Sequence, residues 1–164
     1  MYLPFEEMPS GARIWVYQSD RKLTQEEESL VAEKLRSFCD QWNTHGALMP
    51  TSFDIKYGKF IILSVDESRL GASGCSIDSS VKTLRNIEET LGINLLNQGK
   101  VSFMDGDEVT TATLPEIKSY ITAGKLGEDT FIFNPVVDKK QDLEEKWLIS
   151  AKESWLNKYF NNKF

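Results

Sequence analysis

The chain has 164 residues and a formal net charge of −6, with 19 basic residues scattered among 25 acidic ones. A duplex-binding protein needs clustered Lys and Arg to neutralise phosphates, and an anionic membrane attracts the same clusters, so the composition excludes nucleic acid and membrane as expected partners. The length and the apolar share of 40% are typical of one globular domain with its own core. We therefore expect residues 1–164 to form a single domain.

The N-terminus and the cysteines predict a cytoplasmic protein. The first residues lack a basic stretch followed by an apolar run, and no apolar run approaches the length of a membrane span. Cys39 and Cys75 are too few for a disulfide framework and are expected to be free thiols in a reducing compartment. A zinc site needs Cys/His pairs at short spacing, which this chain does not have, so no metal or other cofactor is predicted.

The first predicted elements are a strand and a helix. Arg13–Gln18 is rich in β-branched and aromatic side chains, which favours a strand. Thr24 precedes Glu27 by three residues, a capping-box pattern that predicts the start of a helix. Gly46 is expected to end this helix as its C-cap. The apolar face of the helix is formed, at helical spacing, by Val31, Leu35, Phe38, Cys39 and Trp42.

Two strands and a second helix follow. Alternating apolar and polar residues over Phe53–Tyr57 predict a half-buried strand, and a turn at Gly58 leads to the next strand. Phe60–Val65 is apolar at consecutive positions, which predicts a central strand buried on both faces. The second helix is predicted from about Asp78 to Leu91, with Gly92 ending it.

The last third of the chain predicts shorter elements. Strands at 101–104 and 108–112 flank Asp105-Gly106, a dipeptide that favours a tight turn. Thr113 and Glu116 form a second capping box, which begins a short helix that stops at Gly124. The remaining predictions are a strand at 130–133, a helix at 138–147 and an aromatic, partly ordered segment at 154–160.

The order of these elements predicts an α+β fold. The pattern β-α-β-β-α-β over about the first hundred residues matches the ferredoxin-like arrangement, and further strands and helices follow it. We therefore expect a mainly antiparallel sheet with helices on one face, built as a ferredoxin-like βαββαβ core with C-terminal additions.

The segment Gly71–Ser80 is the strongest candidate for a functional site. It joins the apolar strand to the second helix, and its small residues let the backbone turn tightly and approach another group closely. Free N–H groups at a helix start can hold an anion or make a thiol more acidic. Cys75 is expected one to three residues before this start and is the candidate nucleophile. The alternative is a small buried residue in a tight turn.

His45, the single histidine, is the candidate catalytic partner of Cys75. A catalytic cysteine needs a His base that an Asn or Asp orients, and Asn43 and Asp78 are available. The alternative for His45 is an exposed side chain at a helix C-terminus. The sequence does not bring His45 and Cys75 together in space.

Polar residues of the same segment form a candidate anion site. Their hydroxyls and backbone can hold a phosphate or carboxylate, and Arg69 and Lys82 flank the segment with positive charge. The alternative is helix capping, which we favour for at least one of Ser76 and Asp78. The candidate ligand-binding residues are Ser73, Gly74, Ser76, Asp78 and Ser79.

A resemblance to known proteins rests on segments that span nearly the full chain: Tyr2–Pro9, Trp15–Ser19, Phe38–Asn43 with His45-Gly46, Gly71–Ser80 and Glu153–Trp155. These segments resemble a family of small bacterial proteins, known chiefly from the Bacteroidetes, whose members often carry the label "ABC transporter ATPase". The resemblance implies a soluble bacterial protein and brings no catalytic residues with it.

The residues do not support the ATPase label. A P-loop needs Gly, four residues and then Gly-Lys-Ser/Thr, because its backbone cradles the phosphates and its Lys reaches them. The three Gly-Lys pairs of this chain are followed by Phe60, Val101 and Leu126, none of which is Ser or Thr. No Gly stands five positions before the Gly of any pair. The signature Leu-Ser-Gly-Gly-Gln is absent too. ATP hydrolysis by a P-loop mechanism is therefore excluded.

Three functions stay open. The favoured one is a non-catalytic binding or regulatory domain that engages a protein or a small anionic ligand, because the chain is poor in catalytic groups. The second is a small enzyme or anion-binding protein that uses Cys75, with or without His45. The third is a homo-oligomer with the aromatic C-terminal segment in its interface. The sequence does not identify the ligand, the partner or the oligomeric state.

Overall fold

The computed structural model describes residues 1–97 and 99–161, and these fall into two compact units. The first unit contains residues 1–97 and 138–141, and the second contains residues 99–137 and 142–161. The chain therefore returns to the first unit once, after the second has begun. The expectation of one domain over residues 1–164 stays a prediction. Among the described residues, no helix is both long enough and apolar enough to cross a membrane.

The first unit is built on a three-stranded antiparallel sheet. Its strands are β1 (Arg13–Gln18), β4 (Thr51–Lys56) and β5 (Phe60–Val65), in the order β1-β5-β4. Val65 of β5 pairs with Arg13 on one side and Thr51 on the other. All six residues of β5 are buried, which confirms the predicted central strand.

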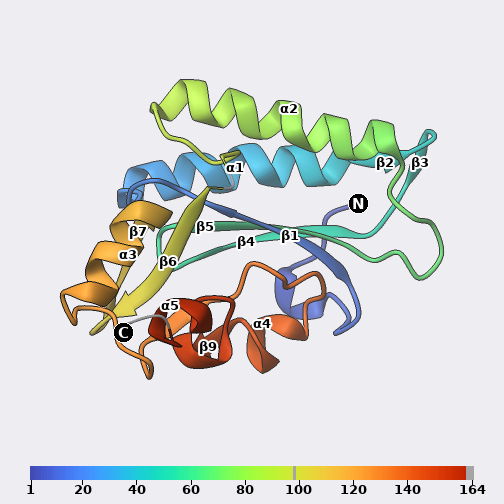
Figure 1. The fold of residues 1–164 in the computed structure, drawn as a ribbon. Coiled ribbons are helices and arrows are strands. Elements are labelled where there is room, and N and C mark those ends of the chain that lie inside the picture. The colour runs from blue at the N-terminus through green and yellow to red at the C-terminus, as the bar shows by residue number, and fades with distance from the viewer. Residues whose placement is uncertain (98, 162–164) are drawn as a thin grey trace. The chain divides into compact units, whose positions relative to one another are not determined.

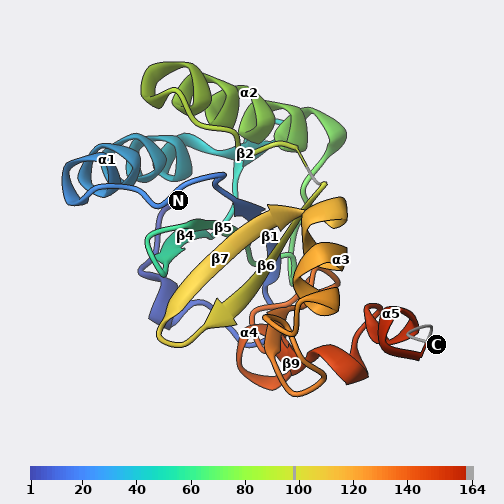
Figure 2. The same ribbon diagram turned by 60° about the vertical axis from the view of Figure 1, so that its left-hand side comes forward.

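Two long helices, α1 (Gln25–Gln41) and α2 (Gly74–Leu91), lie on the same face of this sheet (Figures 1 and 2). The capping box of Thr24 and Glu27 is present, so the predicted start of α1 is confirmed. Their apolar faces meet the sheet in one core, because each helix gathers its apolar residues on one side and alternate strand residues point to the face that the helices cover. This core includes Tyr17, Val31, Leu35, Ile61, Leu63, Val65, Leu84 and Ile87.

Helix α1 ends at Gln41, so the predicted C-cap at Gly46 is wrong. The chain leaves the helix at Trp42 and forms a hairpin of β2 (Asn43–Thr44) and β3 (Ala47–Leu48). Its two turn residues, His45 (φ 50°) and Gly46 (φ 80°), are both left-handed, which is the conformation that a two-residue hairpin favours. A glycine after the apolar face of a helix is compatible with a C-cap or with a hairpin turn. The pairing of β2 with β3 places Gly46 in the turn.

Helix α2 begins at Gly74, four residues before the predicted start at Asp78. Its N-cap is Ser73, because the Ser73 hydroxyl accepts a hydrogen bond from the backbone N–H of Ser76. The polar residues at 73–80 hide this earlier start, since they interrupt the apolar stripe from which the helix was predicted. The predicted end is confirmed: Gly92 adopts φ 65° and closes the helix.

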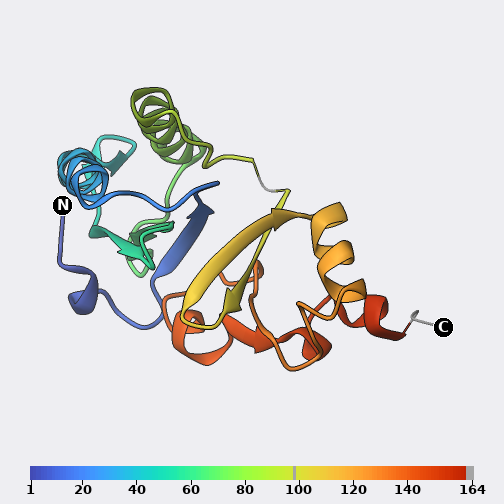
Figure 3. The ribbon, with the colours of Figure 1, turned by 90° about the vertical axis from the view of Figure 1, so that its left-hand side faces the viewer.

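The second unit holds a four-stranded antiparallel sheet in the order β7-β6-β8-β9. Strands β6 (Lys100–Asp105) and β7 (Glu108–Thr113) form the predicted hairpin, and α3 (Leu114–Thr122) follows β7 through the predicted capping box (Figure 3). Strand β8 (Phe131–Phe133) confirms the strand predicted at 130–133 to within one residue. The core of this unit includes Phe103, Ile117, Ile121, Leu126, Ile132, Leu156 and Phe160.

The predicted helix over 138–147 is largely wrong. Backbone hydrogen bonds join residues 138–141 to residues 10–14 of the first unit, where the Ile14 N–H donates to the Asp138 carbonyl at 3.0 Å. Only α4 (Asp142–Glu145) is helical, and the short β9 (Leu148–Ser150) follows it. The four residues of α4 are too few to show a helical period, and the three residues of β9 are too few to show alternation. The C-terminal helix is α5 (Asn157–Asn161), and two 3₁₀ turns lie at Phe5–Glu7 and Ala151–Glu153.

The fold is α+β with antiparallel sheets, as predicted. The strand expected to be the fourth of a ferredoxin-like core lies in β6, and β6 belongs to the sheet of the second unit. The first sheet therefore holds three named strands, β1, β5 and β4.

Candidate functional site

The strand-to-helix turn before α2 is held by an internal carboxylate. The Ala72 N–H donates to Glu67 Oε2 at 2.7 Å, and the Arg13 guanidinium lies 3.5 Å from the same oxygen. A Cβ atom on Gly71 would lie only 3.3 Å from this oxygen, so a side chain at that position would push against Glu67. The small residue at 71 thus lets the turn fold over its own acidic side chain.

Two of the predicted ligand-binding hydroxyls serve the helix start. Ser73 Oγ accepts from the Ser76 N–H at 3.1 Å and lies 2.8 Å from Ser76 Oγ. Ser76 is buried, and its hydroxyl donates to the Asn43 carbonyl at 2.5 Å. The expectation that Ser76 or Asp78 caps the helix is therefore wrong. The N-cap is Ser73, because it has the extended conformation just before the first turn.

The other predicted ligand residues lie on the exposed side of the first turns of α2. Gly74 and Asp78 are exposed, and open space surrounds the Cβ position of Gly74. The Ser79 hydroxyl donates to the Cys75 carbonyl at 3.0 Å. A ligand-binding role for Ser73, Gly74, Ser76, Asp78 and Ser79 stays a prediction.

The two cysteines have opposite environments. Cys75 is exposed and is the second residue of α2. The sequence predicted it just before the helix, whereas it lies inside the first turn. Cys39 is buried, and burial raises the pKa of its thiol to about 12. Cys75 is therefore the accessible thiol of the described chain.

His45 is exposed at the tip of the β2–β3 hairpin. Within the described residues, no hydrogen bond or ion pair joins the side chains of His45 and Cys75. The Asn43 amide, a predicted orienting group, instead accepts from the Gly46 N–H at 3.1 Å and so stabilises the turn. A catalytic role for His45 stays a prediction.

A hollow opens on one side of the Gly71–Ser80 segment. It encloses about 480 Å³, and we call it the apolar hollow. Three of its side chains are large, apolar and exposed: Met1 at 46%, Leu48 at 60% and Leu70 at 43%. The complete lining is Met1, Leu48, Met49, Pro50, Arg69 and Leu70. The sequence predicted that Arg69 supplies charge beside this segment. It did not predict the apolar residues around Leu48, which lie more than twenty positions before Gly71 and have no local pattern that relates them to it.

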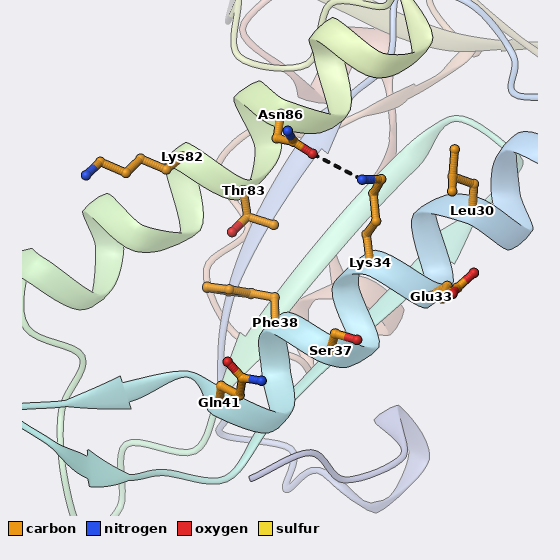
Figure 4. A pocket seen from close by; sticks show the side chains of 9 residues that line it. All are labelled: Leu30, Glu33, Lys34, Ser37, Phe38, Gln41, Lys82, Thr83 and Asn86. Atoms are coloured by element: carbon orange, nitrogen blue, oxygen red, sulfur yellow. Dashed lines mark hydrogen bonds between the residues drawn. The ribbon is translucent and has the colours of Figure 1, made fainter.

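A second recess, the polar groove, lies between α1 and α2, is open to solvent and has a volume of about 570 Å³ (Figure 4). Lys34 of α1 reaches across it, and its ammonium donates to Asn86 Oδ1 at 3.2 Å. Lys82, the other predicted flanking charge, lines the groove from α2. The complete lining is Leu30, Glu33, Lys34, Ser37, Phe38, Gln41, Lys82, Thr83 and Asn86.

The start of α2 is tied to the end of α1 by one buried side chain. Trp42 is 2% exposed, and its indole Nε1–H donates to the Ser76 carbonyl at 2.8 Å. Its ring packs against Phe38 at a centroid distance of 4.9 Å and against Trp15 at 5.8 Å. Sequence reasoning placed Trp42 on the apolar face of α1 but did not reveal this contact with the candidate segment. The contact holds Phe38, a lining residue of the polar groove, in place.

Lys59 is a buried cation that the sequence did not reveal as unusual. It is 7% exposed, and this burial lowers the pKa of its ammonium while Asp20 opposes the shift. It directly precedes β5, at the end of that strand opposite to Val65 and the loop to Gly71. Lys59 therefore belongs to neither the apolar hollow nor the polar groove.

The aromatic C-terminal segment is divided between core and surface. Phe160 is 4% exposed within the core of the second unit, whereas Trp155 is 40% exposed. Phe160 is thus occupied inside its own chain, and Trp155 is the more accessible of the two rings. The predicted homo-oligomer stays a prediction.

No group of three or more His, Cys, Asp and Glu side chains in residues 1–97 and 99–161 is arranged to hold a metal ion. Comparisons of the chain with protein-family models, with curated proteins and with solved structures find no match. Membership of the bacterial family that the sequence resembles therefore stays a prediction, and the function must be inferred from the geometry of the chain itself.

Proposed function

We propose that the chain is a cytosolic, non-catalytic binding or regulatory protein, and that the apolar hollow is its face for a protein partner. One observation carries this proposal: three exposed large apolar side chains, Met1, Leu48 and Leu70, line the same hollow. Single exposed apolar residues are ordinary on a protein surface, whereas a gathered patch is typical of an interaction site.

The lining of the hollow supports recognition rather than catalysis. It contains no Cys, His, Asp, Glu or Ser, and so no ordinary nucleophile or general acid–base. Its one charged side chain is Arg69, for which the described chain holds neither a hydrogen-bond acceptor nor a carboxylate partner. Guanidinium groups pair well with carboxylates. The hollow therefore fits a partner segment that presents a large apolar side chain beside an acidic group.

A labelled peptide with leucine flanked by glutamates tests this proposal by fluorescence anisotropy. Leu48→Asp is expected to weaken binding about tenfold or more, because burying a leucine contributes about 1.5–3 kcal/mol and tenfold corresponds to about 1.4 kcal/mol. Arg69→Glu is expected to reverse the preference towards a peptide with lysines in place of the glutamates.

The matched control is Tyr57→Asp, because Tyr57 is 45% exposed and lies outside the lining of the hollow. This variant is expected to bind the peptide as the parent protein does. Equal losses at Leu48 and Tyr57, or no binding of the peptide to the parent protein at about 1 mM, would contradict the proposal.

A second candidate function is thiol chemistry at Cys75, and the observation that favours it is the exposure of this thiol in the first turn of an 18-residue helix. The N–H groups of a helix's first turn favour a thiolate in general. Iodoacetamide is expected to alkylate Cys75 near pH 7 faster than it alkylates a cysteine peptide, and Cys75→Ser should abolish any turnover of thioesters or peroxides. A thiol that reacts only above about pH 8 would contradict this function.

We also propose that the first unit is a ferredoxin-like core in which residues 138–141 take the place of the fourth strand. The strand order β1-β5-β4 and the two helices on one face support this arrangement. So does an antiparallel bridge from Arg13 to Lys139 at the free edge of β1. The amide of Ile14, bonded to Asp138, should then exchange its hydrogen as slowly as the amides that bond to β5; fast exchange at Ile14 would contradict the arrangement.

A further inference from the structure

We infer that the polar groove is a second binding site, independent of the apolar hollow, and that it takes a small anion with a flat heteroaromatic ring. The groove lies between α1 and α2, and its volume of about 570 Å³ falls within the usual range of small-molecule sites, about 300–1,000 Å³. It shares no lining residue with the apolar hollow.

The charges of the groove favour an anion. The lining of the groove holds two cationic side chains, Lys34 and Lys82, and one carboxylate, Glu33, in a chain whose net charge is −6. Among the described residues, neither lysine has a carboxylate within ion-pair distance. The groove is thus a local positive site on an acidic protein, which raises the local concentration of small anions.

Lys34 is the side chain best placed to contact the anion. It is half-buried and reaches across the groove, whereas Lys82 and Glu33 point away from its centre (Figure 4). Its ammonium has three N–H donors, of which one is used by Asn86. Within residues 1–97 and 99–161 the other two have no acceptor and remain for a ligand, and partial burial reduces the screening of this charge by salt.

Phe38 offers a surface for a flat ring. Its side chain is half-buried and extends along the groove beneath Thr83 (Figure 4). The contact with Trp42, at a centroid distance of 4.9 Å, restricts the rotation of the Phe38 ring. Less side-chain entropy is therefore lost when a ligand binds against it. Aromatic rings associate by offset stacking or edge-to-face contact, so a flat ligand ring gains most from this neighbour.

The polar side chains around Phe38 favour a heterocycle over a hydrocarbon ring. Gln41 and Asn86 carry amides and Ser37 carries a hydroxyl, and such groups both donate and accept hydrogen bonds. The ring nitrogen of a heteroaromatic ring accepts a hydrogen bond, and a nucleobase donates as well, whereas the edge of a hydrocarbon ring would displace water from these groups without replacing its bonds. The phosphate of a mononucleotide and the carboxylate of a pyridine acid both meet these requirements.

Matched ligand pairs test the inference by isothermal titration calorimetry with the full chain. Nicotinate and nicotinamide share a ring and differ in charge, as do adenosine monophosphate and adenosine; benzoate lacks the ring nitrogen of nicotinate. The anion of each pair is expected to bind about fivefold or more tightly than its neutral counterpart, and nicotinate more tightly than benzoate.

Three variants assign any binding to the groove. Lys34→Met, which keeps a similar side-chain length, is expected to remove the preference for the anion over the neutral ligand, whereas Arg85→Met, a change of an exposed cation of α2 outside the lining, should leave it unchanged. Asn86→Trp places a ring in the groove and is expected to abolish binding of every ligand. Because Asn86 is exposed, this substitution leaves the core intact.

Equal affinity for nicotinate and nicotinamide would overturn the anionic part of the inference, and equal affinity for benzoate and nicotinate would overturn its heteroaromatic part. No binding of any of these ligands at about 10 mM, or binding that Asn86→Trp leaves unchanged, would overturn the site itself. Peptide binding at the apolar hollow is expected to survive Lys34→Met, so failure at one site is distinguishable from failure at the other.

Discussion

Replacing Ser73 by alanine tests how the strand-to-helix turn before α2 is built. The Ser73 hydroxyl accepts from the Ser76 N–H at 3.1 Å and contacts the Ser76 hydroxyl at 2.8 Å. Alanine keeps the backbone but leaves this N–H without its acceptor. The helix start then depends on Ser76, whose hydroxyl still donates to the Asn43 carbonyl.

The expected loss follows from these contacts. An N-cap serine replaced by alanine costs about 1 kcal/mol, and the lost contact between hydroxyls adds up to about 1 kcal/mol. For a urea dependence of about 2 kcal/mol per molar, the unfolding midpoint should fall by about 0.5–1 M. Ser73→Asn should keep most of the stability, because the asparagine side chain also accepts from the first turn.

Circular dichroism of the helices is the suitable assay. Helices α1 and α2 contain 17 and 18 residues, whereas α3 contains 9, so the helical signal reports chiefly on the first unit. Asp78→Ala is the matched control, because Asp78 is exposed and lies beyond the cap, and its free energy of unfolding should stay within about 0.5 kcal/mol of that of the parent. Equal shifts for Ser73→Ala and Asp78→Ala, or a Ser73→Asn variant as weak as Ser73→Ala, would refute this account of the helix start.

Three further predictions concern the thiols, one ion pair and the core. Thiol labelling of the folded protein should modify Cys75 alone, because burial raises the pKa of Cys39 to about 12; labelling of both before unfolding would contradict this. The hydrogen bond from Arg21 lowers the pKa of Glu27 from 4.5 to about 2, so its contribution to stability is present above pH 4.5 and is lost as the pH falls towards 2. Acid titration of the unfolding midpoint should therefore fall more steeply for the parent than for Glu27→Gln, and parallel curves would refute the contribution. Leu84→Ala removes a fully buried side chain of α2 and should lower the free energy of unfolding by about 2–5 kcal/mol in a urea titration; a loss below about 1 kcal/mol would show that the site is not close-packed.

Elements with strong local signals could be predicted from the sequence to within a few residues. The bounds of β1 and β5 agree with the prediction, because β-branched and apolar runs end at turn residues on both sides. The start of α1 agrees as well, since the Thr24–Glu27 capping box is a contact within one turn of chain. In each case the residues that decide the structure are close neighbours in sequence.

Elements that depend on a distant partner were missed. The β2–β3 hairpin has only two residues in each strand. Trp42 directly precedes this hairpin, and its indole is hydrogen-bonded to Ser76, more than thirty positions away. Residues 138–141 read as part of a helix, yet they pair with residues 10–14. Backbone hydrogen bonds of this kind leave no periodic trace in a short segment, because they satisfy N–H and C=O groups whatever the side chain.

The candidate site shows the same division. The sequence drew attention to Gly71–Ser80 and to its flanking charges, Arg69 and Lys82, and one recess opens beside each of these two charges. Leu48 and Phe38 complete the two linings, and nothing in the local pattern relates them to the segment. Surface recesses are formed by residues from several elements, so their lining becomes visible only when the elements are packed.

By itself, the sequence determined the α+β class, the two long helices and their apolar faces, and the exclusion of a P-loop, because each depends on composition or on spacing within one element. Only the tertiary structure decided that Ser73 caps α2, that Cys75 is exposed while Cys39 is buried, and that the surface beside Leu48 is hollow. These properties arise from contacts between residues far apart in the chain, and the burial of a side chain depends on everything that packs around it.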